Sequence, residues 1–125
     1  PTVERAGGPG FDAWWEQLRR GALELAILLT LARESRYGLE IIRHLENRTD
    51  LVVAEGTIYP ILARLTRDRL LESTWREEGV HPRKYYRLTE RGRVRLERMT
   101  RSWEEFAGKM SRLIAAASGG RHEGE

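Results

Sequence analysis

The chain has 125 residues, of which 40% are hydrophobic and 33% charged; this balance predicts one water-soluble globular domain and excludes a chain built mainly of membrane spans. The absence of cysteine excludes disulfides and thiolate metal sites and favours a reducing cytoplasm. All 22 basic side chains except Lys84 and Lys109 are arginine, which suits phosphates and guanine edges, but a net charge of +3 does not by itself establish nucleic-acid binding.

The first predicted helix follows a loose arm. Residues 1–10, PTVERAGGPG, lack periodicity and are rich in glycine and proline, which indicates a flexible segment. A helix is then expected over residues 12–33. Its second half, ALELAILLTLA, is apolar on nearly every side and is interrupted only by Glu24. This pattern predicts burial on more than one side, and a second copy of the chain is the obvious cover.

A second, short helix is expected over residues 37–48, YGLEIIRHLENR, with Ser35 as its N-cap. A third helix is expected in residues 55–65, EGTIYPILARL, ending near Asp68. Four apolar residues recur in it at the spacing of one helical face: Ile58, Ile61, Leu62 and Leu65.

The opposite face of this third helix is nearly bare. If the apolar stripe faces the core, then Gly56, Pro60, Ala63 and Arg67 point outward. We call these four residues the outward ridge. A low ridge lets a helix backbone approach the major groove of DNA closely, with polar side chains at its edges. The alternative is a shorter helix that starts at Pro60, in the favoured first helical position.

A β-hairpin is expected next. Residues 70–78 and 83–89 alternate in polarity as strands do, and residues 79–82, GVHP, have the composition of a turn. Arg83 and Lys84 lie near the tip, opposite Arg76, where basic side chains can reach phosphates or the minor groove. Equally, an exposed hairpin tip often carries charge without any ligand. The order of elements predicts a mainly α-helical winged helix-turn-helix over residues 11–89.

A long C-terminal helix is expected over residues 90–117, with Thr89 as N-cap and a disordered tail over 118–125. Its apolar residues alternate spacings of three and four, which is a heptad seam and predicts a dimer helix. The seam consists of Leu96, Met99, Trp103, Phe106, Met110 and Leu113.

These motifs together resemble the PadR family of bacterial transcription regulators. The resemblance rests on YGLEI (37–41), EGTIYPILARL (55–65), LLESTW (70–75) and PRKYYRLTERG (82–92). It implies a dimeric repressor that binds a roughly palindromic operator, and a third helix that begins before Pro60. The expected DNA contacts, including the ridge glycine, are Tyr37, Gly56, Thr57, Tyr59, Arg64, Arg83 and Lys84.

The sequence departs from the family pattern at two positions. Ala54 stands where a capping serine is common, a loss of about 1 kcal/mol unless another group compensates. Arg69 stands where a helix-ending glycine is usual, so either this arginine adopts the left-handed conformation or the turn has another geometry.

Trp103 has two interpretations. It is either ordinary packing in the dimer interface or a platform for a planar aromatic effector, as in short PadR-like regulators that it resembles. Met99 and Phe106 lie near it on the same seam. Trp14 and Trp15 are candidates for lining the same cavity, or are surface or interface aromatics.

Nothing in the sequence indicates catalysis, a metal site or a cofactor. The three histidines, His44, His81 and His122, are expected on a helix, a hairpin tip and a tail, and neither HExxH nor a P-loop is present. We therefore expect no enzyme. The competing interpretations are a winged helix that binds another protein, and a DNA-binding protein without a small-molecule effector.

Overall fold

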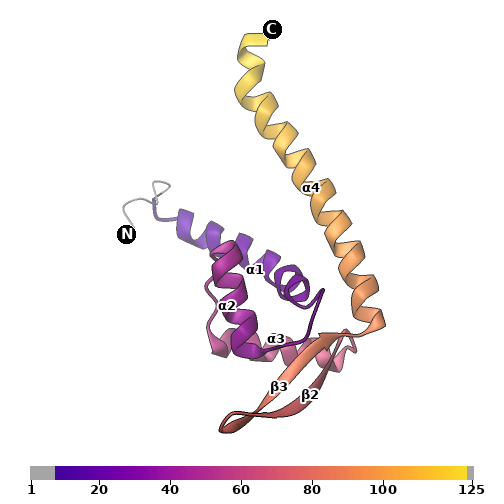
Figure 1. The fold of residues 1–125 in the computed structure, drawn as a ribbon. Helices are drawn as coiled ribbons and strands as arrows, with labels where there is room; N and C mark the ends of the chain where they lie inside the picture. The colour runs from indigo at the N-terminus through magenta and orange to yellow at the C-terminus, as the bar shows by residue number, and fades with distance from the viewer. Residues whose placement is uncertain (1–7, 124–125) are drawn as a thin grey trace.

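The computed structural model describes residues 8–123. Three helices pack together, a β-hairpin leaves this bundle at one end, and a long helix projects in the opposite direction (Figure 1). The described elements are, in chain order, α1 (Phe11–Thr30), β1 (Arg36–Tyr37), α2 (Gly38–Thr49), α3 (Glu55–Arg67), β2 (Leu71–Glu78), β3 (His81–Leu88) and α4 (Glu90–Glu123). This is the predicted winged helix-turn-helix with a long C-terminal helix. Most of the predicted flexible arm, residues 1–7, lies outside the described residues.

The core lies where α1, α2 and α3 meet the base of the hairpin. The side chains that are almost fully buried there are Ile27, Leu28, Leu31, Ile41, Leu45, Ile58, Leu62, Leu65, Leu70 and Leu71. Helix α1 ends at Thr30, three residues before the predicted end, and Leu31 follows as its C-cap. In the described part of the chain, no helix combines the length and apolar character that crossing a membrane requires.

A third strand joins the sheet. The order is β1-β3-β2, both pairs are antiparallel, and Tyr37 of β1 pairs with Tyr85 of β3. Two residues are too short to show an alternating pattern, so the sequence did not predict β1. The N-cap of α2 is Tyr37 and not Ser35, and the Tyr37 amide donates to Glu40 Oε1 over 3.2 Å. The prediction of a Ser35 cap was wrong because β1 pairing carries the chain past Ser35 before the helix starts.

The hairpin turn is tighter than predicted. Glu78 pairs with His81, so only Gly79 and Val80 form the turn, whereas residues 79–82 were expected to do so. Gly79 has φ +63°, the left-handed conformation that two-residue hairpin turns require. His81 and Pro82 consequently belong to β3.

Helix α3 begins at Glu55, so the longer of the two predicted helices is correct and a start at Pro60 is wrong. Ala54 caps it without a side-chain hydrogen bond, as the sequence indicated. At the other end Arg69 has φ +66°, and the Leu70 amide donates to the Leu65 carbonyl over 2.9 Å. This bond belongs to a Schellman motif, in which an arginine takes the position that glycine usually fills.

The start of α4 is held by a backbone junction at Leu70. The Leu70 carbonyl accepts the Thr89 amide over 3.1 Å, and the Thr89 hydroxyl donates to the Arg69 carbonyl over 2.6 Å. The same hydroxyl accepts the Gly92 amide over 3.0 Å, which confirms Thr89 as the N-cap. Gly92 lies so close to Leu70 that an added Cβ would overlap the Leu70 carbonyl oxygen.

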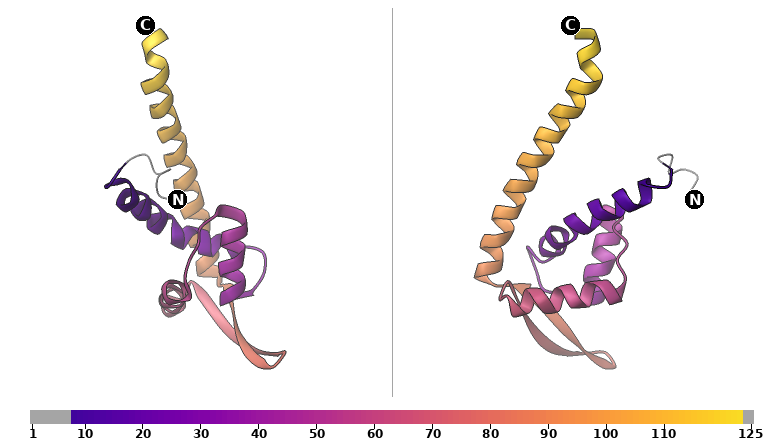
Figure 2. Two further views of the ribbon diagram at one scale, coloured as in Figure 1. Left: turned by 90° about the vertical axis from the view of Figure 1, so that its left-hand side faces the viewer. Right: turned by 180° about the vertical axis from the view of Figure 1, so that it is seen from behind.

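Helix α4 is longer than predicted and projects away from the bundle in every view (Figure 2). It continues to Glu123, past the expected end near Ala117, so the expected disordered tail is corrected for residues 118–123; residues 124–125 lie outside the described part.

The predicted seam of α4 divides into two parts. Leu96 is buried in the chain's own core and Met99 is half-buried against it, so both side chains take part in the packing of the single chain. The remaining four residues, Trp103, Phe106, Met110 and Leu113, are between 40% and 64% exposed in the single chain.

We predict that Gly92→Ala destabilises the fold by about 1–3 kcal/mol, because the new methyl group must displace the Leu70 backbone. Chemical unfolding followed by circular dichroism, at one fixed chain concentration, measures this change. Gly108→Ala is the matched control on the same helix. A Cβ added there would have Arg112 Nη1 as its nearest neighbour, at 3.9 Å, so the free energy of unfolding should rise by about 0.5–1 kcal/mol. Equal behaviour of the two variants would contradict a close contact at the junction.

Candidate nucleic-acid interface

The outward ridge of α3 is exposed as predicted. Gly56, Pro60, Ala63 and Arg67 all face solvent, while Ile58, Leu62 and Leu65 are fully buried on the opposite side. Gly56 carries no Cβ, and a methyl group added there would meet nothing within 4 Å. The ridge therefore presents helix backbone that another surface can approach closely.

Tyr59 lies on the flank of α3 that faces α2 and the hairpin. Its ring covers the Cα of Gly38, where any Cβ would overlap the ring and its hydroxyl oxygen. Burial, with a smaller contribution from Glu55, raises the pKa of Tyr59 above its ordinary value. The hydroxyl therefore stays protonated near neutral pH and can both donate and accept a hydrogen bond.

A groove of about 470 Å³ joins α3 to the hairpin. Its lining residues are Tyr37, Gly38, Leu39, Tyr59, Trp75, Pro82, Arg83, Lys84 and Tyr86. Four of the seven predicted contact residues thus come together here: Tyr37, Tyr59, Arg83 and Lys84.

The hairpin cations lie against aromatic rings. The Arg83 guanidinium is 4.5 Å from the centre of the Tyr37 ring, and Lys84 Nζ is 5.8 Å from the Trp75 ring. Such contacts hold the charged groups in place without neutralising them. Trp75 is 64% exposed and was not among the predicted site residues. Trp75 lies opposite Lys84 on the neighbouring strand, and this position would have marked it as a site residue. The position is known only once the register of the two strands is known.

A carboxylate braces the other face of the hairpin. The Tyr85 hydroxyl donates to Glu78 Oε1 over 2.6 Å, and this hydrogen bond raises the pKa of Tyr85. Arg83 Nη1 lies 3.7 Å from the same oxygen, and Arg76 stacks 3.9 Å from the centre of the Tyr85 ring. Tyr85 and Tyr37 meet edge to face at 5.4 Å, so the hairpin, β1 and the start of α2 form one connected surface.

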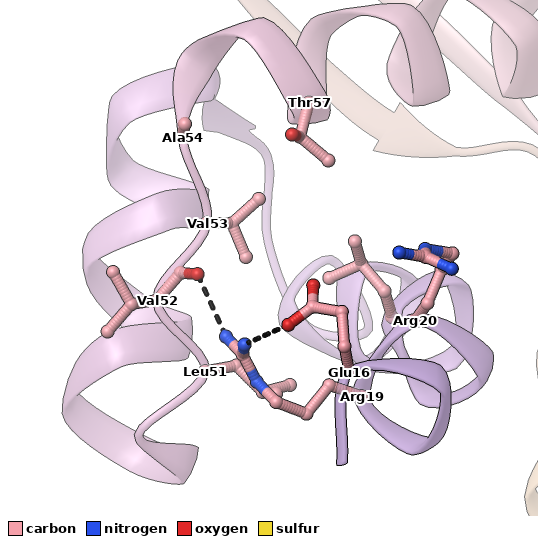
Figure 3. A pocket seen from close by; sticks show the side chains of 9 residues that line it. Glu16, Arg19, Arg20, Leu51, Val52, Val53, Ala54 and Thr57 are labelled. Carbon is pink, nitrogen blue, oxygen red and sulfur yellow. Dashed lines mark hydrogen bonds and ion pairs between the residues drawn. The ribbon is translucent and has the colours of Figure 1, made fainter. Parts of the chain in front are cut away.

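Thr57 lies on the opposite flank of α3, beside α1. It lines a cavity of about 170 Å³ together with Arg20 and Arg19 (Figure 3). Arg19 donates to the Val52 carbonyl over 3.0 Å and pairs with Glu16 at 3.2 Å, which ties α1 to the segment before α3. Arg20, which was not among the predicted site residues, has no ion pair of its own within residues 8–123.

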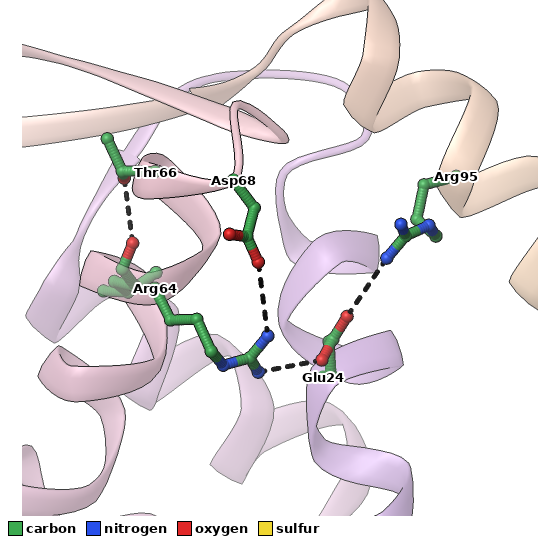
Figure 4. Close-up of polar contacts among 6 residues, drawn as sticks. Glu24, Arg64, Thr66, Asp68 and Arg95 are labelled. Carbon is green, nitrogen blue, oxygen red and sulfur yellow. Dashed lines mark hydrogen bonds and ion pairs between the residues drawn. The ribbon is translucent and has the colours of Figure 1, made fainter.

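Like Gly56 and Thr57, Arg64 lies outside the groove. Its guanidinium turns toward α1, where Nη2 donates to Glu24 Oε1 over 2.9 Å (Figure 4). The sequence placed Arg64 correctly at the edge of the ridge. Its partner lies 40 residues away in the chain, so local pattern alone did not predict the ion pair.

A second concave region lies between α1 and α4. A cavity of about 490 Å³ is lined by Gly21, Ala22, Leu25, Arg95, Arg98, Met99, Ser102, Trp103 and Phe106. Three of the five predicted effector residues, Met99, Trp103 and Phe106, therefore meet there. Trp103 also lines an adjoining cavity with Trp15.

Trp14 lines neither of these cavities; it is 55% exposed and packs against the rings of Phe11 and Trp15 at 5.7 and 6.1 Å. No group of three or more His, Cys, Asp or Glu side chains within the described residues is arranged to bind a metal ion.

Comparison with known proteins is consistent with this geometry. A transcriptional regulator from Mycobacterium tuberculosis is 36% identical over 91 residues, which cover 73% of this chain and 84% of that protein. The crystal structure of a PadR family transcriptional regulator from Eggerthella lenta is 32% identical, with a TM-score of 0.74 over 82% of this chain and 90% of the other. Bacillus subtilis PadR in complex with operator DNA is 25% identical, with a TM-score of 0.58 over 62% of this chain and 46% of that one.

The family model for the transcriptional regulator PadR-like family matches residues 27–98, which span the end of α1, α2, α3, the hairpin and the start of α4. The match includes the outward ridge, the groove and the hairpin tip. The chain therefore belongs to the PadR-like family of transcriptional regulators.

Proposed function

We propose that this chain is a dimeric repressor that binds a roughly palindromic operator through α3 and the hairpin. The observation that carries the proposal is the groove in which Tyr59 of α3 meets Arg83 and Lys84 of the hairpin, directly beside the bare ridge. The Bacillus subtilis relative, whose structure contains operator DNA, supports the assignment to DNA.

The two elements make different contacts in this proposal. Helix α3 enters the major groove, where Gly56 and Ala63 permit close approach and Tyr59 and Arg67 reach polar groups. The hairpin lies along the backbone, where Arg83 and Lys84 bind phosphates. Aromatic rings already order both cations, so less side-chain entropy is lost on binding than for free surface lysines and arginines.

The exposed seam of α4 supports a dimer. Trp103, Phe106, Met110 and Leu113 follow heptad spacing and leave a continuous apolar strip exposed in the single chain. Pairing two copies through this strip relates them by a two-fold axis, as a palindromic operator requires. The two α3 helices are then expected about 34 Å apart, one turn of DNA.

The cavity between α1 and α4 supports an effector site for a planar aromatic molecule. Trp103 and Phe106 supply apolar rings, while Arg95 and Arg98 bring two positive charges to the same lining. A flat ring that carries a negative charge matches this lining better than a cationic ring does. Trp103 belongs to both the cavity and the exposed seam. A bound ring and the dimer contact therefore compete for this side chain or share it. This common contact would link effector binding to release from DNA.

We predict that Tyr59→Ala and Arg83→Ala each weaken binding to the duplex DNA upstream of the chain's own gene by about tenfold, as expected for the loss of one hydrogen bond to a charged group. Arg83→Ala should also reduce the slope of log K against log salt by about 0.9, because one phosphate contact is lost. Fluorescence anisotropy with labelled duplex at several salt concentrations measures both quantities.

Arg87→Ala is the matched control for these variants. It removes one arginine from the same strand, but this arginine pairs with Glu72 near the base of the hairpin. We expect an unchanged salt slope. Size-exclusion chromatography should show dimers for all three variants. Dissociation of Tyr59→Ala or Arg83→Ala into monomers would instead show that the substituted residue stabilises the folded structure.

We predict that anthraquinone-2-sulfonate, a planar anion, quenches tryptophan fluorescence and releases the duplex, and that Trp103→Ala abolishes both effects. Ethidium, a planar cation, should quench the DNA-free protein less, because Arg95 and Arg98 repel it.

Trp75→Phe provides the control for fluorescence, since it removes a hairpin tryptophan and leaves the α1–α4 cavity intact. Quenching by the anion should persist in this variant. Undiminished quenching in Trp103→Ala would place the bound ring elsewhere and leave a DNA-binding protein without this effector site.

A further inference from the structure

Glu24 is a charged side chain in an otherwise apolar segment. It interrupts residues 22–32 of the sequence, and its neighbours Leu23 and Leu25 are buried in the core. The Glu24 side chain is only 27% exposed. A carboxylate in such surroundings is unfavourable unless cations compensate it.

Two arginines from different helices supply this compensation (Figure 4). Arg64 of α3 donates from Nη2 to Glu24 Oε1 over 2.9 Å, and Arg95 of α4 places Nη1 3.9 Å from Oε2. The carboxylate of α1 thus lies between the helix proposed to read DNA and the long C-terminal helix.

Both terminal nitrogens of Arg64 face carboxylates. Nη1 lies 3.9 Å from Asp68 Oδ2. The side chain is nevertheless 43% exposed, and Arg64 lies next to Ala63 and one turn after Pro60 of the outward ridge. A guanidinium in this position is within reach of a phosphate beside α3 once Glu24, its closer partner, no longer holds it, because the remaining contact with the exposed Asp68 is 3.9 Å long.

We propose that Glu24 is a positioning residue that holds Arg64 against α1 and keeps it from contacting DNA. This proposal rests on the proposed function. It adds that the contact between Glu24 and Arg64 keeps the affinity for DNA below the value that the outward ridge and the hairpin would otherwise allow. Arg95 shares the carboxylate and offsets the cost of its partial burial, so the contact persists in the absence of any ligand.

The central experiment compares wild type with Glu24→Gln on labelled duplex DNA from the region upstream of the chain's own gene. The amide has nearly the shape of the carboxylate but no charge, so Arg64 is released to a phosphate. Affinity should rise about three- to tenfold near 0.1 M salt, and the slope of log K against log salt should become steeper by about 0.9.

Two controls separate this mechanism from a general change in charge. In Glu24→Gln/Arg64→Gln, the gain in affinity and slope should disappear, because Arg64 itself makes the new contact. Glu105→Gln, which removes one exposed carboxylate from α4, should leave the slope unchanged. A gain that persists in the double variant, or that Glu105→Gln reproduces, would overturn the proposal.

A second variant keeps the test independent of how Glu24→Gln folds. Arg64→Gln in the wild-type background should change neither the salt slope nor the affinity by more than about twofold, since a held arginine makes no phosphate contact. A slope reduced by about 0.9 would show that Arg64 already binds DNA, and would overturn the proposal.

The two proposals fail in different ways. If wild type ignores the duplex even at low salt, DNA binding itself is wrong, and the role of Glu24 falls with it. If wild type binds but Glu24→Gln weakens binding or leaves it unchanged, only the role of Glu24 is overturned.

Discussion

The backbone junction at Leu70 determines how the functional parts of this chain are arranged. The Leu70 amide ends α3 through the Leu65 carbonyl, while the Leu70 carbonyl accepts the Thr89 amide where α4 begins. The hairpin starts at the next residue, so one peptide segment sets the positions of α3, the hairpin and α4 together. Gly92 permits this approach because it carries no side chain toward Leu70. Any loosening here would change the angle between the surface proposed to bind DNA and α4.

The surface proposed to bind DNA is ordered before it meets a ligand. Tyr59 rests on Gly38, Arg83 stacks on Tyr37, and Lys84 approaches Trp75. Each contact joins a polar group to an aromatic or backbone surface from another element, so the groove depends on the three-stranded sheet as much as on α3. Rigid placement of this kind lowers the entropy lost on binding.

Helix α1 connects the two proposed sites. Its buried residues pack in the core, Gly21, Ala22 and Leu25 line the cavity against α4, and Glu24 reaches Arg64 of α3 between them. One turn of α1 therefore lines the proposed effector cavity and also contacts α3, the helix proposed to read DNA. Figure 4 shows Glu24 between Arg64 of α3 and Arg95 of α4. Arg95 lines the cavity and also lies 3.9 Å from Glu24, so this single side chain connects the cavity with the ion pair of Glu24 and Arg64.

Local periodicity, turn composition and motif spacing were sufficient to predict the helices, the hairpin, the outward ridge and the family. Apolar spacing placed Ile58, Leu62 and Leu65 inward and left Gly56 and Ala63 outside. Features that depend on residues far apart in the chain became visible only in the folded molecule: the short strand β1, the Tyr37 cap, the burial of Leu96 and the ion pair of Arg64 with Glu24. Periodicity shows which face of an element is apolar, but it does not show which partner covers that face or where a long arginine side chain finds its carboxylate. Those contacts exist only after α1, α3 and α4 have packed together.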